Sequence, residues 1–221
     1  MKVGILIAAY NEGNQIGQLV RMLKQMKFVP IVVDDGSQDN TAKEAETNGA
    51  NVIRHKKNLG KGASLKTGIN YILKEDYDAV LIMDGDAQHS PNDVHKFIDL
   101  ADKQPNAVII GNRMGNAKNM PVDRKLTNMF MSFIVSLICG QRIPDSQCGF
   151  RLMKREFLKG IKIESARFEV ESEILIKASR ARIKILSVPI ETLYGEEASQ
   201  INPFVDTIRF IVFILKFPFM K

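Results

Sequence analysis

A regular alternation of short apolar runs with helical periodicity fills the first half of the chain and most constrains its fold. The apolar runs cover residues 3–9, 31–34, 51–54, 80–84 and 107–111, and the helical patterns between them cover 12–27, 39–48, 63–73 and 92–103. Runs that are apolar throughout are typical of parallel strands, because helices bury both faces of such a sheet. The sequence therefore predicts an α/β fold with a mostly parallel sheet flanked by helices.

Polar residues follow the apolar runs, each time at the same end. The clusters are Tyr10-Asn11-Glu12, Asp34-Asp35-Gly36-Ser37, Asp84 to Gln88, and Asn112-Arg113. Open parallel sheets bind their ligands outside the carboxyl ends of the strands. Polar side chains gathered at those ends therefore indicate one binding site for a polar ligand.

The fourth apolar run ends in Asp84-Gly85-Asp86, and Gln88 follows. Alternate residues of an extended chain share a face, so the two carboxylates are expected to converge and to repel each other unless a cation joins them. Carboxylate and amide oxygens suit Mg²⁺ or Mn²⁺, which makes these side chains candidate metal ligands. A polar turn is the alternative, because Asp and Gly both favour turns. The next residue, His89, is interpreted as a surface residue.

Two strongly apolar helical segments are predicted in the second half, over residues 126–140 and 203–217. Both are too short or too interrupted to span a bilayer, so they either pack as core or lie on a membrane surface. Residues 113–142 contain five basic residues, one of which is Lys118, and one acidic residue. This local positive charge implies an anionic partner, such as phosphate, an acidic membrane or nucleic acid. The lack of Trp and of an aromatic stacking platform argues against nucleic acid.

Four motifs occur together in the first half. They are Ala-Ala-Tyr-Asn-Glu at 8–12, Val-Val-Asp-Asp-Gly-Ser-Gln-Asp-Asn-Thr at 32–41, Asn-Leu-Gly-Lys-Gly at 58–62 and Asp-Gly-Asp-Ala-Gln-His at 84–89. In this order and spacing they resemble the family 2 inverting glycosyltransferases, in particular the dolichyl- or polyprenyl-phosphate mannose and glucose synthases. The resemblance implies a GT-A (Rossmann-like) domain over residues 1–200 and a C-terminal apolar amphipathic helix over 201–221.

The resemblance also implies a function: metal-dependent transfer of a sugar from a GDP- or UDP-linked donor to a polyprenyl phosphate, by a peripheral protein on the cytoplasmic face of a membrane. It implies donor binding by Ala9, Tyr10, Glu12, Asp35, Lys61, Asp84 and Arg113. It implies Mg²⁺ or Mn²⁺ at Asp84, Asp86 and Gln88. Catalytic roles fall to Asp86, Arg124 and Asp145, with Arg124 at the acceptor phosphate and Asp145 facing the acceptor.

The chain departs from the family pattern where the acceptor is expected. Asn128 stands where relatives have a serine, and the basic residues usual at 195–200 are largely missing. A sugar hydroxyl of a glycan or glycolipid therefore stays open as the acceptor, and Asp145 would then act as the base. A non-catalytic, membrane-associated nucleotide-binding protein and a sugar nucleotidyltransferase are the competing functions. A nucleotidyltransferase typically has a basic glycine-rich loop after its first strand, where this chain has neither Lys nor Arg.

Overall fold

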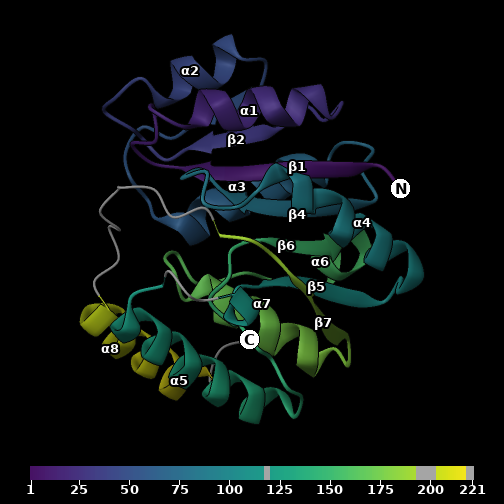
Figure 1. Cartoon of the computed structure of the whole chain (residues 1–221), viewed down its shortest axis with the longest axis vertical. Coiled ribbons are helices and arrows are strands. Elements are labelled where there is room, and N and C mark those ends of the chain that lie inside the picture. Colours follow the sequence, from purple (N-terminus) through teal and green to yellow (C-terminus); the bar gives the residue numbers. More distant parts are fainter. Residues whose placement is uncertain (117–119, 193–202, 218–221) are drawn as a thin grey trace.

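The computed structural model describes residues 1–116, 120–192 and 203–217, in which a seven-stranded sheet lies between two layers of helices (Figure 1). The strands are β1 (Val3–Ala9), β2 (Ile31–Asp34), β3 (Asn51–Arg54), β4 (Ala79–Asp84), β5 (Ala107–Asn112), β6 (Arg151–Lys154) and β7 (Lys184–Pro189), in the order β3-β2-β1-β4-β6-β5-β7. The α-helices are α1 (Ile16–Gln25), α2 (Thr41–Thr47), α3 (Lys61–Ile72), α4 (Val94–Lys103), α5 (Val122–Cys139), α6 (Arg155–Gly160), α7 (Val170–Arg180) and α8 (Pro203–Lys216), with single 3₁₀ turns η1 (Pro91–Asp93) and η2 (Met114–Asn116). The predicted α/β fold with a mostly parallel sheet is confirmed.

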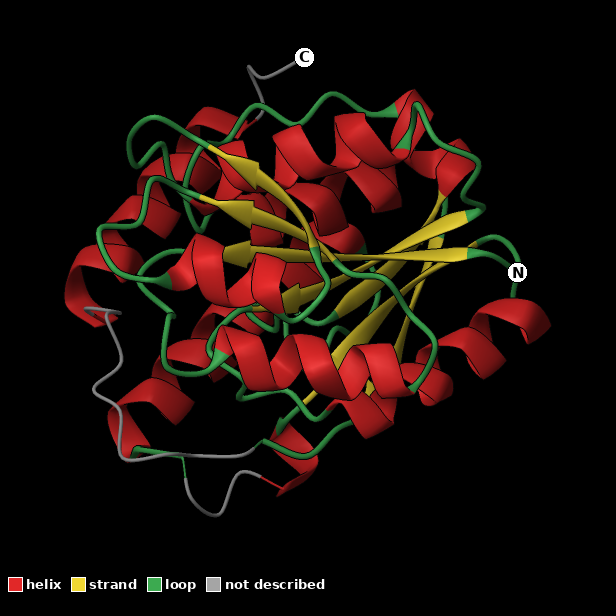
Figure 2. Ribbon diagram, turned by 90° about the horizontal axis from the view of Figure 1, so that it is seen from above, coloured by secondary structure: helices red, strands yellow, loops and turns green. Residues whose placement is uncertain are grey.

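The two faces of the sheet have separate apolar cores, and Figure 2 shows helices on both sides of the strands. Helices α1, α2 and α4 cover one face, and α3, α5, α6, α7 and α8 cover the other. The helical spacing of α1 explains its position, because Ile16, Leu19, Val20 and Leu23 are all almost fully buried. This double cover is the reason β1, β2, β4 and β5 are apolar up to their last residues.

Strand β6 was not predicted as part of the sheet. It runs antiparallel to both of its neighbours, β4 and β5, while the other strand pairs are parallel. Arg151 pairs with Ile82 of β4 and with Ile110 of β5. The turn before β6 therefore lies beside the carboxyl ends of β4 and β5, where the polar clusters gather.

Helix α5 is apolar on both faces. Its inward face packs Met131, Val135 and Cys139 against the core beside Asn128 and Ser132. Its outward face is also large and apolar, with Leu126, Met129, Phe130, Phe133, Leu137 and Ile138 exposed. Helix α8 packs beside α5 and likewise exposes Ile208, Ile211, Val212 and Leu215 (Figure 1). The interpretation in which these segments pack as core is therefore wrong for the exposed stripe of α5, whereas the segment 203–217 does contribute Phe210, Phe213 and Phe217 to the core.

Within the described ranges, no helix combines the length and the apolar character that crossing a membrane would require. Lys118 and the stretch 195–200, both singled out in the sequence, lie outside the described residues.

Candidate active site

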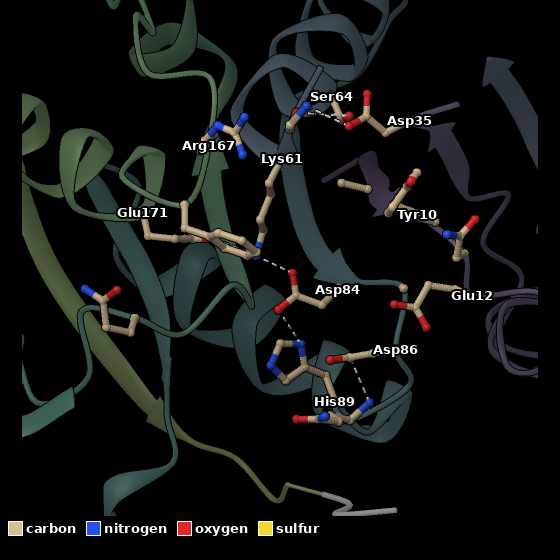
Figure 3. Close-up of a pocket in the computed structure, with 18 of the residues that line it drawn as sticks. Tyr10, Glu12, Asp35, Lys61, Ser64, Asp84, Asp86, His89, Arg167 and Glu171 are labelled. Carbon is tan, nitrogen blue, oxygen red and sulfur yellow. Dashed lines mark hydrogen bonds and ion pairs between the residues drawn. The ribbon is translucent and has the colours of Figure 1, made fainter. Parts of the chain in front are cut away.

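A cavity of about 560 Å³ opens at the carboxyl ends of β1, β2, β4 and β5. It is lined by ten of the predicted site residues: Ala9, Tyr10, Glu12, Asp35, Lys61, Asp84, Asp86, Gln88, Arg113 and Arg124. Figure 3 shows many of these side chains converging on one space. Asp145 is the predicted site residue that does not line the cavity.

The carboxylate pair lies at the end of β4. Lys61 Nζ is 2.5 Å from Asp84 Oδ1. Burial alone would raise the pKa of Asp84, but the charge of Lys61 holds that pKa well below its usual range. Burial and the charge of Asp84 raise the pKa of Asp86 to about 6. The charge of Lys61 therefore stabilises the ionised form of Asp84, whereas too little positive charge lies near Asp86 to do the same for that carboxylate.

The interpretation of His89 as a surface residue is wrong, because its side chain is 3% exposed. Its ring stacks on Phe150 with centroids 5.2 Å apart, and its Nδ1 lies 4.0 Å from Asp84 Oδ2 (Figure 3). Burial lowers the pKa of His89 to about 4, so the ring is neutral at pH 7. The chain turns at Ala87, which has a positive φ of 53°, and this turn directs His89 inward.

Lys61 also contacts a carboxylate that the sequence did not single out. Its Nζ lies 2.7 Å from Glu171 Oε1 on α7, and Arg151 Nη2 lies 2.6 Å from the other oxygen of Glu171. Burial would lower the pKa of Lys61, but the two carboxylates raise it above its usual range. Asp84, Lys61, Glu171 and Arg151 thus form one chain of alternating charges that reaches from β4 to β6.

The glycine-containing loop at 58–62 is explained by packing. A Cβ atom at Gly60 or Gly62 would overlap the backbone at Ser165 and Ala166, so both glycines permit close approach of that segment. The loop is held by Asp35, which accepts hydrogen bonds from Leu59 N at 3.0 Å and Gly60 N at 2.7 Å.

Asp145 lies behind Arg113, away from the cavity. The Arg113 guanidinium donates to both of its oxygens, from Nε at 2.7 Å and from Nη2 at 2.9 Å. Burial would raise the pKa of Asp145, but Arg113 holds it below its usual range. Asp145 is therefore an ionised partner that fixes Arg113 at the cavity wall.

The wall on the side of the second half comes from α5 and from the start of α7. Arg124, Thr127, Asn128 and Met131 contribute from α5, and Arg167 and Phe168 precede α7. No pattern in the sequence marks Arg167 or Phe168, because neither follows a strand nor belongs to a motif.

Comparison with known proteins gives consistent matches. The model of glycosyl transferase family 2 matches residues 4–161. A UDP-N-acetylglucosamine–dolichyl-phosphate N-acetylglucosaminyltransferase of Methanococcus voltae is 34% identical over 215 residues, which cover 87% of this chain and 86% of that protein. A dolichol-phosphate mannosyltransferase of Pyrococcus furiosus is 29% identical over 202 residues, which cover 86% of this chain and 56% of that protein.

Among solved structures, glucosyl-3-phosphoglycerate synthase of Mycobacterium tuberculosis, in complex with Mn²⁺, uridine diphosphate and phosphoglyceric acid, has a TM-score of 0.76 at 17% identity. The match covers 97% of this chain and 78% of that chain. This similarity confirms that the predicted fold is of the GT-A type.

Proposed function

The chain belongs to glycosyl transferase family 2, and we propose that it transfers a sugar, with inversion, from a nucleoside-diphosphate sugar to a polyprenyl phosphate of the dolichyl type. One observation carries the proposal: the carboxylates of Asp84 and Asp86 and the guanidinium of Arg124 line the same cavity. Arg124 belongs to the helix whose outer face is apolar. Such a cavity suits a diphosphate donor together with an anionic acceptor that has an apolar tail.

Asp84 and Asp86 fit a divalent cation such as Mg²⁺ or Mn²⁺. The raised pKa of Asp86 indicates that the pair lacks positive charge, and Gln88 adds an amide oxygen in the same cavity. No group of three or more His, Cys, Asp and Glu side chains is arranged to hold a metal in the part of the chain that the structure describes. Sites that use one or two carboxylates complete their shell with substrate phosphates and water. When bound, the cation would stabilise the charge on the leaving diphosphate as a Lewis acid.

The donor nucleoside is proposed to lie against Ala9, Tyr10, Glu12 and Asp35, at the ends of β1 and β2. Asp35 would act in part by holding the loop at Leu59 and Gly60 in place, since its carboxylate accepts from both backbone N–H groups. UDP- and GDP-linked sugars both remain candidate donors.

The acceptor phosphate is proposed to bind Arg124 through charge-assisted hydrogen bonds. A phosphate monoester is already anionic near neutral pH, so its attack on the sugar requires no strong base. A sugar hydroxyl would require one, and Asp145 is fully buried and engaged by Arg113. This supports the phosphate as acceptor and a positioning role for Asp145, which acts through Arg113.

A membrane surface is the proposed partner of the exposed stripes on α5 and α8. Basic residues flank these stripes: Arg124, Lys125, Arg142, Arg209 and Lys216. Apolar faces with flanking basic residues bind anionic lipid surfaces. The acceptor head group would then meet Arg124 where it emerges from the bilayer, which is consistent with a peripheral protein.

A donor screen tests the proposed function. Purified protein is incubated with UDP- and GDP-linked sugars, with Mn²⁺ or Mg²⁺, and with polyprenyl phosphate or the polyprenol that lacks the phosphate. We expect release of nucleoside diphosphate and a lipid-linked sugar with the phosphate and with one class of donor. Transfer to a glycan hydroxyl without polyprenyl phosphate would contradict the proposal.

Two neighbouring basic residues provide a matched control for the acceptor site. Arg124 lines the cavity, whereas Lys125 is exposed and does not line it. With the acceptor in neutral detergent, so that no anionic surface contributes, Arg124→Gln is expected to raise the KM for polyprenyl phosphate about tenfold or more, as the loss of a charge-assisted contact does, and Lys125→Gln to leave it within about twofold. Equal effects would mean that only the summed charge of this segment matters.

A further inference from the structure

Lys61 is shared by two carboxylates from opposite halves of the chain, of which Glu171 is buried and Asp84 is partly exposed to the cavity. Its ammonium lies 2.5 Å from Asp84 Oδ1 and 2.7 Å from Glu171 Oε1 (Figure 3). The side chain of Lys61 is 13% exposed, and that of Glu171 is 4% exposed. Charges at such depth require a partner, because an unpaired buried ion is strongly unfavourable. Asp84 therefore already has a cation, at the position where the proposed function requires a divalent one.

The two contacts of Lys61 differ in how firmly they are held. Glu171 is fixed from behind by Arg151, whose side chain is fully buried and also donates to the backbone oxygens of Ser146 and Cys148. Asp84 is at the end of a strand and faces the cavity, with its side chain 25% exposed. The lysine ammonium is compact and lies on a flexible stem, so it can leave one oxygen while it keeps another.

We propose that Lys61 is an exchangeable counter-ion: it neutralises Asp84 until the donor arrives and then moves its contact to the donor diphosphate, while Glu171 keeps the ammonium within reach. The inference rests on the proposed function and adds a role for Glu171 as a positioning residue. A divalent cation at Asp84 competes with Lys61 when nucleotide is absent. When nucleotide binds, the Lys61 ammonium contacts its diphosphate instead, and Lys61 no longer competes with the divalent cation for Asp84.

The consequence is a coupling between nucleotide and metal. Nucleoside diphosphate should increase the affinity for Mn²⁺ by more than direct metal–phosphate contact provides, and this coupling is reciprocal. A fixed charge at Lys61 would instead weaken Mn²⁺ binding by the same factor with and without nucleotide. The Kd for Mn²⁺ without nucleotide, divided by the Kd with nucleotide, therefore distinguishes an exchangeable lysine from a static one.

The experiment measures Mn²⁺ binding by electron paramagnetic resonance of the free ion, with the full chain, in the absence and presence of saturating UDP or GDP. Lys61→Met is expected to bind Mn²⁺ about fivefold or more tightly than wild type without nucleotide, and to show a ratio of Kd values about fivefold or more smaller. Lys66→Met, on the same helix α3 and without an ion pair among the described residues, should match wild type.

An unchanged ratio in Lys61→Met would overturn the inference. If Lys61→Met does not fold because Glu171 loses its partner, the double variant Lys61→Met/Glu171→Gln removes both charges and is expected to give the same smaller ratio. Failure of wild type to bind either nucleotide, measured by equilibrium dialysis, would overturn the proposed function itself. If nucleotide increases the Mn²⁺ affinity of wild type and the ratio of Kd values is the same in Lys61→Met, only the role of Lys61 is overturned.

Discussion

At the scale of single residues, Asp86 lowers the stability of the folded protein because its carboxylate is partly buried beside Asp84 without enough positive charge. The same environment favours the binding of a cation. Burial and the charge of Asp84 raise the pKa of Asp86 to about 6, whereas an aspartate in an unfolded chain titrates near about 3.9. A carboxyl whose pKa rises on folding favours the folded state only while it is protonated. Its stability contribution is therefore lost as the pH rises from about 4 to about 6.

Asp86→Asn should remove this cost together with the activity. Without metal, we expect the variant to be more stable than wild type by about 1–2 kcal/mol at about pH 7.5, with a smaller difference at about pH 4.5. Urea unfolding in EDTA at both pH values measures the difference, and release of nucleoside diphosphate measures the loss of transfer, which EDTA should reproduce in wild type. A stability difference that does not vary with pH would contradict the raised pKa, and full turnover would contradict the metal site.

Gly149 lies against the Asp84 carboxylate so closely that a Cβ atom would overlap both of its oxygens. Its φ is not positive, so alanine fits the backbone at this position. We expect Gly149→Ala to displace Asp84 and to weaken Mn²⁺ binding about tenfold, since small misplacements of this kind are costly. Gly115→Ala is the control, because nothing lies within 4 Å of a Cβ atom there. Normal Mn²⁺ affinity in Gly149→Ala would argue that Asp84 is not a ligand.

The sequence predicted those site residues that directly follow a strand, because a strand end fixes their position. Asp84 and Asp86 are examples: Asp84 ends β4, Asp86 lies in the turn that follows it, and both line the cavity. His89 and Glu171 could not be found in this way. Their burial depends on segments far away in the sequence: His89 bridges to Thr192, and Glu171 contacts Lys61.

At the scale of elements, the parallel strands were predictable and β6 was not. The parallel strands β1, β4 and β5 are six or seven residues long and apolar up to the polar residues at or just after their ends, whereas β6 is four residues long with Arg151 and Lys154 at its ends. Its place in the sheet depends on β4 and β5, which no local pattern encodes. For α5 the periodicity identified which residues share a face, but periodicity does not say which face points outward.

The outward face of α5 gives a direct test of membrane binding. Leu137 is 64% exposed on this face, and Val29 is 41% exposed just before β2, at the opposite end of the strands from the cavity. Leu137→Glu should weaken co-sedimentation with anionic liposomes about tenfold, because it removes an apolar side chain that would enter the lipid and adds charge repulsion. Val29→Glu should have no effect, and in wild type the binding should weaken as salt rises. Equal sedimentation of both variants would exclude α5 from the docking surface.

At the scale of the whole molecule, the N-terminal half of the chain meets the C-terminal half at the start of α3. Ala63 N donates to Ala166 O at 3.2 Å, and a Cβ atom at Gly62 would overlap the backbone of Ser165. This close approach brings Lys61 and Glu171 together, so the charges of the site depend on a close fit between the halves.

Gly62→Ala should separate the halves slightly. We expect a loss of about 1–3 kcal/mol of stability, which is typical of overpacking, together with weaker nucleotide binding. Gly160→Ala is the control, because a Cβ atom there meets nothing within 4 Å and alanine is at least as good a helix former. Thermal unfolding and equilibrium dialysis with UDP and GDP measure both effects. A Gly62→Ala protein as stable as the Gly160→Ala control would show that the two halves can move apart freely.

The apolar outer face of α5 also bears on kinetics, because the same helix lines the cavity with Arg124 and Asn128. An enzyme that rests on this face takes its donor from water but meets its acceptor by diffusion within the plane of the bilayer. Its rate then follows the mole fraction of acceptor in the membrane. Adding acceptor-free vesicle lipid at constant total acceptor should slow transfer by surface dilution and leave the donor KM unchanged. A rate indifferent to that dilution would mean that the acceptor is captured from solution.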